Sequence, residues 1–187
     1  TKHYDFGLAD ALKYDEQDRI SLMLIGIYAV VGLYHLFLFY RRREERYNFY
    51  YGAFAFIVSL YIYTRTSVIF ENNWDTAIIQ KFEFAILYPG VVFLIESLGA
   101  LFNNKPNRWT KYYAYFSYTI CVLTLLCPEM YLAEYILRVW QISVLVCVLP
   151  LILYTFYLAI SKKANNAKLL LTGFIFFMAA SIYDILE

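Results

Sequence analysis

Six long apolar stretches divide this chain, and the short loops between them alternate between basic and non-basic. The second and fourth loops, around residues 71–75 and 127–134, contain no Lys or Arg. The first, third and fifth loops hold ten of the 16 Lys and Arg residues, namely Arg41, Arg42, Arg43, Arg46, Lys105, Arg108, Lys111, Lys162, Lys163 and Lys168. Because short loops rich in Lys and Arg stay on the cytoplasmic side of a membrane, the pattern predicts a polytopic membrane protein with its N-terminus outside.

Composition agrees with a membrane protein and argues against several other classes. Hydrophobic residues make up 61% of the 187 residues and aromatic residues 21%, more than a soluble domain of this length usually carries. No basic patch with interleaved aromatic residues lies in a soluble context, so nucleic-acid binding is not expected. The cysteines and histidines have neither disulfide nor metal-ligand spacing, so we expect no disulfide framework, metal or other cofactor.

The apolar stretches predict an all-α fold, a polytopic transmembrane helical bundle. The visible spans lie at about residues 20–40, 47–66, 77–102, 112–126, 133–160 and 169–186. At 1.5 Å per residue, the first of them is long enough to cross ~30 Å of hydrocarbon. Pro89 in the third span and Pro150 in the fifth are expected to tilt or kink their helices. Small residues in the third span, Gly90, Ser97 and Gly99, are expected to allow close approach of neighbouring helices.

The chain divides near residue 19. Residues 1–19 are polar and mildly acidic, and we expect an extracytoplasmic juxtamembrane linker, helical from Leu8, that leads into a membrane domain of residues 20–187. The linker lacks both an initiator Met and the basic-then-apolar pattern of a signal peptide. Six spans that start outside also end outside, so we expect a longer protein in which a seventh span follows.

The stretch from Leu24 to Thr66 contains an ordered set of features. Glycines lie in the outer half of the first span, followed by an aromatic-His step, a basic turn and a Tyr-rich opening of the second span; the residues are Gly26, Gly32, Tyr34, His35, Arg41, Arg42, Arg43, Tyr47, Tyr50 and Tyr51. This order resembles the membrane domain of bacterial seven-transmembrane receptors with diverse intracellular signalling modules. Arg65-Thr66, residues 81–84 and residues 173–186, with the late acidic residue Asp184, resemble parts of the family's second, third and sixth spans.

The resemblance implies a transmembrane signal relay. Such receptors place a ligand-binding domain outside, seven helices in the bacterial inner membrane, and an output enzyme such as a cyclase, kinase or phosphatase inside. The implied partners are the lipid bilayer, an extracytoplasmic sensor domain, a cytoplasmic output domain and a second copy in a homodimer. The segment itself is not expected to be an enzyme, since it has no phosphate-binding loop, no metal-spaced His and Glu pair, and no nucleophile with a base nearby in sequence.

Charged residues near the outer ends of four spans are the first candidate relay group. They are Arg65, Lys81, Glu83, Glu134, Arg138 and Asp184. Ordinary interface charges explain Lys81 and Glu134 best, whereas the family resemblance falls on Arg65, Glu83 and Asp184. Opposite charges there would favour one arrangement of the helices over another, which a two-state relay needs.

Two ionisable residues inside spans form the second candidate group, because a charge in the membrane is costly and calls for a partner or a function. His35 and Glu96 lie at similar depth in two spans that run in the same direction, so they could pair as a proton-sensitive latch. The alternative is a packed imidazole and a carboxyl group that is protonated or bonded to a hydroxyl such as that of Ser97.

A carrier or channel is the competing functional hypothesis, with His35 and Glu96 as a proton relay. Transporters of this kind have broken helices near the midplane and inverted repeats. The breaks at Pro89 and Pro150 weakly match the first property, but the chain has no convincing internal repeat. An intramembrane enzyme has the least support.

Overall fold

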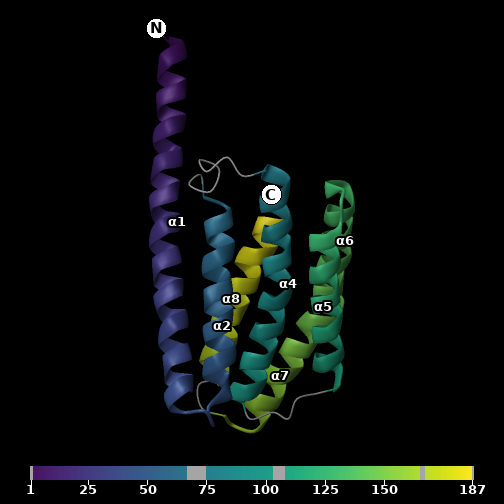
Figure 1. Cartoon of the computed structure of the whole chain (residues 1–187). Coiled ribbons are helices and arrows are strands. Elements are labelled where there is room, and N and C mark those ends of the chain that lie inside the picture. The colour runs from purple at the N-terminus through teal and green to yellow at the C-terminus, as the bar shows by residue number, and fades with distance from the viewer. Residues whose placement is uncertain (1, 67–74, 103–107, 165–166, 187) are drawn as a thin grey trace.

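Helices alone make up the regular structure in the described part of the chain, as predicted. The computed structural model describes residues 2–66, 75–102, 108–164 and 167–186, and side chains within residues 18–66, 75–102, 108–164 and 167–176. The elements are α1 (Lys2–Arg41), α2 (Arg46–Thr64), α4 (Thr76–Leu101), α5 (Arg108–Leu126), α6 (Met130–Ser143), the π-helix η1 (Val144–Val148), α7 (Leu149–Ser161) and α8 (Ala167–Leu186). They run side by side, up and down, in one bundle (Figure 1). The prediction of an all-α bundle is confirmed.

Each predicted span coincides with helical structure, and among the described residues three helical segments are long and apolar enough to cross a membrane by length and composition. These are Asp18–Arg41, Thr76–Leu101 and the continuous helical segment Met130–Ser161. The Tyr-rich helices α2 and α5 lie beside them. Large apolar side chains such as Val30 and Leu126 are exposed on the outer faces of the bundle. Such extensive apolar exposure suits contact with lipid rather than water.

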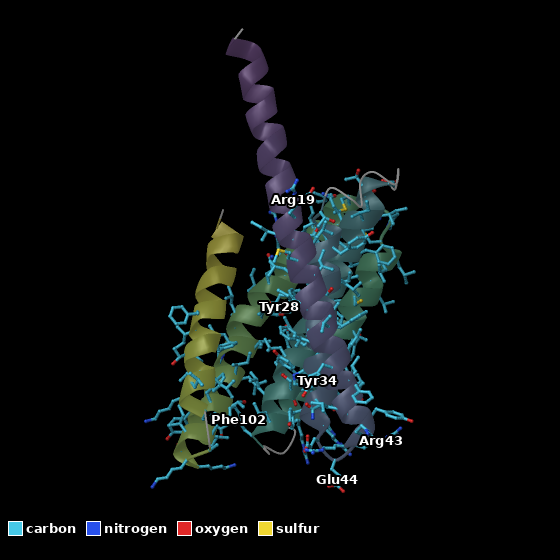
Figure 2. All side chains as sticks on the ribbon, turned by 90° about the vertical axis from the view of Figure 1, so that its left-hand side faces the viewer. Arg19, Tyr28, Tyr34, Arg43, Glu44 and Phe102 are labelled. Atoms are coloured by element: carbon cyan, nitrogen blue, oxygen red, sulfur yellow. The ribbon has the colours of Figure 1, made fainter. Side chains whose placement is uncertain are left out.

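Helix α1 is one continuous helix that joins the predicted linker to the first span, so the predicted helix from Leu8 is present. Figure 2 shows it extending well beyond the other helices, with Arg19 near the level at which the bundle ends and Arg43 at the opposite end. The described basic turns therefore lie at one end of the bundle, and the turn without Lys or Arg between α5 and α6 lies at the other (Figure 1). The turn after α1 and the turn after α7 lie at the same end (Figure 1).

Helices α1 and α2 form an antiparallel hairpin whose backbones nearly touch. A Cβ atom added to Gly52 would lie 2.9 Å from the carbonyl oxygen of Gly32, and one added to Gly32 would lie 3.0 Å from the carbonyl oxygen of Gly52. Towards the other end of the hairpin, the Ser59 hydroxyl donates a 3.1 Å hydrogen bond to the carbonyl of Ile25. Small residues at a helix crossing allow this packing, which makes the hairpin a single unit.

Helix α4 is central, because it packs against α2, α5, α6 and α7. It continues through Pro89 as one helix. A Cβ atom on Gly90 would meet Ile57 of α2 at 3.0 Å, so this glycine allows close approach as predicted. Gly99 is different, since nothing lies within 4 Å of its added Cβ atom. The prediction of close approach is therefore wrong for Gly99.

The predicted break in the fifth span occurs just before Pro150. The chain there forms the π-helix η1 between α6 and α7. Proline has no N–H to donate, and its ring would clash with the carbonyl four residues earlier, at Val146. A widened π turn accommodates both effects. Beyond it, α7 runs obliquely towards the end of the bundle where α8 begins (Figure 1).

Candidate relay sites

The end of the bundle opposite the basic turn contains an ion pair between two of the predicted relay residues. Arg65, directly after α2, places its Nε atom 3.3 Å from Oε1 of Glu83 on α4. The Arg65 side chain is 51% exposed and that of Glu83 is 17% exposed. The Arg65 guanidinium also lies over the Tyr61 ring, 5.3 Å from its centre. The pair therefore joins the end of α2 to the beginning of α4.

Lys81 ties the same part of α4 to a third element. Its Nζ atom donates hydrogen bonds to the carbonyls of Cys127 at 2.7 Å and Pro128 at 3.3 Å, in the turn between α5 and α6. Sequence reasoning treated Lys81 as an ordinary interface charge. It missed this contact because backbone carbonyl acceptors are present in every residue and leave no sequence signal.

The remaining charged residues predicted at the outer end are Glu134, Arg138 and Asp184. Glu134 and Arg138 lie on α6 with exposed side chains. Asp184 belongs to α8, but its side chain lies outside the described residues. Its role as a relay residue therefore stays a prediction.

At the opposite end, a hydrogen-bonded chain links α1 to α2 and to the turn between them. His35 Nδ1 lies 2.8 Å from Oδ1 of the fully buried Asn48. The Asn48 amide nitrogen donates to Oε2 of Glu45 at 2.9 Å. The amide oxygen of Asn48 can only accept a hydrogen bond. The His35 Nδ1–H group is therefore the donor of this bond. Arg42 forms an ion pair with the second oxygen of Glu45 at 3.3 Å.

The environment of the His35 ring is aromatic. Tyr51 packs edge-on against it with ring centres 4.7 Å apart, and Tyr34 does so at 5.5 Å. These contacts and the hydrogen bond to Asn48 fix the ring within the α1–α2 hairpin. Sequence reasoning missed Asn48, although a single amide among aromatic residues at the start of an apolar helix is a signal that could have been used.

The considered pairing of His35 with Glu96 is wrong. No hydrogen bond or ion pair joins them in the part of the chain with described side chains, and His35 bonds to Asn48 instead. Glu96 lies half-buried on α4. The positive charge of Lys111 on α5 is near enough to attract its carboxylate electrostatically. The alternative partner also fails, because the Ser97 hydroxyl donates to the carbonyl of Leu94 at 2.8 Å.

A layer of buried hydroxyl and aromatic groups joins α4, α5 and α6 between the two ends. The hydroxyls of Tyr88 and Thr124 lie 3.1 Å apart, and Trp140 Nε1 donates to the Ser117 hydroxyl at 3.4 Å. The rings of Tyr88 and Trp140 meet edge to face, 5.0 Å between centres. Among the described residues, no cluster of His, Cys, Asp and Glu could hold a metal ion. The layer is satisfied internally and functions as packing.

Comparison with known protein families identifies the family of this chain. The family model described as 7TM diverse intracellular signalling matches residues 17–187, which is almost the whole chain. No curated protein and no solved structure matched the chain. The matched range begins within α1, at the point where the helix meets the bundle.

Proposed function

Because this chain belongs to the 7TM diverse intracellular signalling family, we propose that it is the membrane domain of a bacterial sensory receptor that relays an extracytoplasmic signal to a cytoplasmic output module. The chain is a membrane protein, and we place it in the inner membrane with its basic turns on the cytoplasmic side. In this proposal a sensor domain precedes α1, an output module acts inside, and two copies work as a homodimer. The helices themselves catalyse nothing.

The observation that carries the proposal is the set of charged contacts at the beginning of α4. Glu83 binds Arg65 at the end of α2, and Lys81 binds the α5–α6 turn. Three elements distant in sequence thus meet at one point on the side where the sensor would act. A displacement of any one of them changes these contacts, which is what a relay requires.

The route into this point is the long helix α1. A helix transmits axial or rotational displacement along its length, and α1 extends from beyond the bundle to the basic turn. Since α1 and α2 touch at Gly32 and Gly52, a movement of α1 carries α2 with it. Arg65, at the end of α2, then moves relative to Glu83 on α4.

The strength of the Arg65–Glu83 pair suits a reversible switch. A partly exposed ion pair typically contributes up to ~1 kcal/mol. An energy of about 1 kcal/mol shifts a two-state equilibrium about fivefold. The pair is therefore strong enough to bias one arrangement and weak enough for a sensor domain to overcome.

The test is a charge reversal in the full-length receptor. Arg65→Glu and Glu83→Arg should each change the basal output by a few-fold, because like charges then face each other. The double reversal should restore it. Glu134→Arg, at an exposed position on α6 that an ordinary interface charge explains, serves as the control and should leave the output unchanged. Equal output with and without the membrane helices under every stimulus would overturn the proposal.

In the described part of the chain, the structure does not contain the contact between His35 and Glu96 on which the carrier hypothesis depends. A proton relay through His35 and Glu96 needs the two groups within reach, and His35 is bonded within the α1–α2 hairpin instead. Proton flux in proteoliposomes distinguishes the two functions.

A further inference from the structure

The arginines of the turn between α1 and α2 are not equivalent. Arg42 forms an ion pair with Glu45, 3.3 Å from Nη1 to Oε1. Within the described residues, no carboxylate pairs with Arg43 or Arg46. Both of these side chains instead line an open pocket. Their positive charges are therefore available to an anion from outside the chain.

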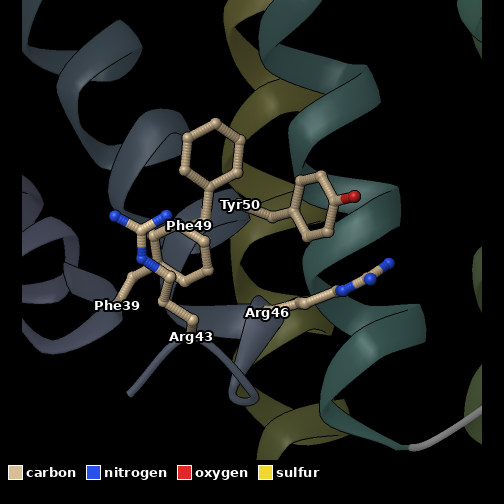
Figure 3. A pocket seen from close by; sticks show the side chains of 5 residues that line it. All are labelled: Phe39, Arg43, Arg46, Phe49 and Tyr50. Atoms are coloured by element: carbon tan, nitrogen blue, oxygen red, sulfur yellow. The ribbon is translucent and has the colours of Figure 1, made fainter. Parts of the chain in front are cut away.

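The remaining walls of the pocket are aromatic. Phe39 at the end of α1 and Phe49 and Tyr50 at the start of α2 complete a cavity of about 370 Å³. Ring centres lie 5.3 Å apart between Phe39 and Phe49, and 5.5 Å apart between Phe49 and Tyr50. Figure 3 shows the Arg43 guanidinium on one side of these rings and that of Arg46 on the other.

Packing against α4 holds the aromatic wall in place. Phe93 of α4 contacts both Phe49 and Tyr50, with ring centres 6.3 Å and 6.4 Å apart. The wall is thus formed before any ligand binds, and rigid rings lose little conformational freedom on binding. Two guanidinium groups beside such a wall fit a ligand with an anionic head and an apolar body.

The position of the pocket indicates that its ligand is a lipid. It lies at the basic end of the bundle, where the membrane-length helix Asp18–Arg41 ends. Side chains at the end of a membrane-spanning helix contact lipid phosphates, and side chains nearer the centre of the bilayer contact acyl chains. Guanidinium groups match phosphate oxygens with paired hydrogen bonds, and juxtamembrane arginines attract anionic lipids.

We propose that an anionic phospholipid of the cytoplasmic leaflet binds here, with its acyl chain against Phe39, Phe49 and Tyr50. Its phosphate headgroup pairs with one of the two guanidinium groups, Arg43 or Arg46, which flank the rings on opposite sides (Figure 3). The bound lipid braces the α1–α2 turn against α4. This site is independent of the relay proposed above, since it requires neither a sensor nor an output.

Native mass spectrometry of the full-length protein tests the site. Phosphatidylglycerol and phosphatidylcholine are titrated separately, and the first anionic lipid should bind about tenfold tighter than the zwitterionic one. In R43Q/R46Q that preference should disappear. K162Q/K163Q removes two charges from another turn at the same end and should retain it. Equal binding of both lipids to the unaltered protein would overturn the proposal.

Two further arms separate the site from general charge effects. R43K/R46K keeps both positive charges, and so the topology, but loses the guanidinium geometry; the preference for phosphatidylglycerol should fall several-fold. Glycerol phosphate, which has no acyl chain, should neither bind nor raise the melting temperature. Undiminished lipid preference in the lysine variant, or equal stabilisation by glycerol phosphate, would contradict a site built for a lipid.

Discussion

The two ends of the bundle hold their helices together in different ways. At the end with the Arg65–Glu83 pair, contacts join charged side chains that are partly exposed and belong to elements distant in sequence. At the basic end, His35 and Glu45 are hydrogen-bonded through the fully buried Asn48 within one hairpin. Exposed charge pairs are weak and sensitive to their surroundings, whereas a buried polar group such as the Asn48 amide is costly to leave without its partners. The first end is suited to change, whereas the second holds α1 and α2 together as one unit.

This comparison predicts that the largest loss of stability comes from the hairpin backbone itself. Gly52→Val places side-chain atoms where the carbonyl of Gly32 and the Leu36 side chain already lie. Overpacking of this kind typically costs about 1–3 kcal/mol. Gly26→Val is the matched control on the same hairpin, because nothing lies within 4 Å of its added Cβ atom. Thermal unfolding in detergent should separate the two variants; equal melting temperatures would show that the helices are not in this contact.

The next largest effect is expected at Asn48. Asn48→Leu keeps the size of the side chain but removes the acceptor for His35 and the donor to Glu45. Hydrogen bonds between membrane helices contribute up to about 1–2 kcal/mol, so stability should fall by that order. Denaturant titration of the purified protein measures it. If N48L is as stable as the unaltered protein, these hydrogen bonds do not hold the hairpin together.

A smaller effect is expected for the exposed pair. Arg65→Ala and Glu83→Ala should each destabilise the protein by less than about 1 kcal/mol. A double-mutant cycle isolates the coupling energy of the two side chains. The same cycle for His35 and Asn48 should give a larger coupling energy. An equal or reversed order would remove the distinction between the two ends.

The smallest effect is expected for Glu96→Gln in a transport assay. Proton flux through proteoliposomes should be the same for the unaltered protein and the variant, and close to that of empty liposomes. Flux well above that of empty liposomes and abolished by E96Q would support the carrier instead.

Sequence reasoning placed each of the six visible spans on helical structure in the described part of the chain, because apolar length and charged loops directly reflect the solvent that each segment meets. The family resemblance also singled out Arg65 and Glu83, which form an ion pair. It could not find the partners of Lys81, since backbone carbonyls carry no sequence signal.

The failure of the His35–Glu96 pairing has a geometric cause. Position along a span gives the depth of a residue in the membrane, but it does not give the direction of its side chain around the helix axis. His35 lies on the face of α1 that meets α2, and α1 packs mainly against α2. Glu96 lies on α4, where Lys111 of α5 acts on it. Although His35 and Glu96 lie at a similar depth in the membrane, their side chains therefore do not meet.

The most direct test of the relay is to prevent movement between α2 and α4 in the full-length receptor. Arg65→Cys and Glu83→Cys would be joined by a thiol crosslinker that a reducing agent can cleave, in a background without Cys121, Cys127 and Cys147. Output activity would be recorded with and without stimulus, before and after reduction. The relay account predicts that the crosslinked receptor does not respond and that reduction restores the response. A crosslinked receptor that responds like the reduced one would contradict it.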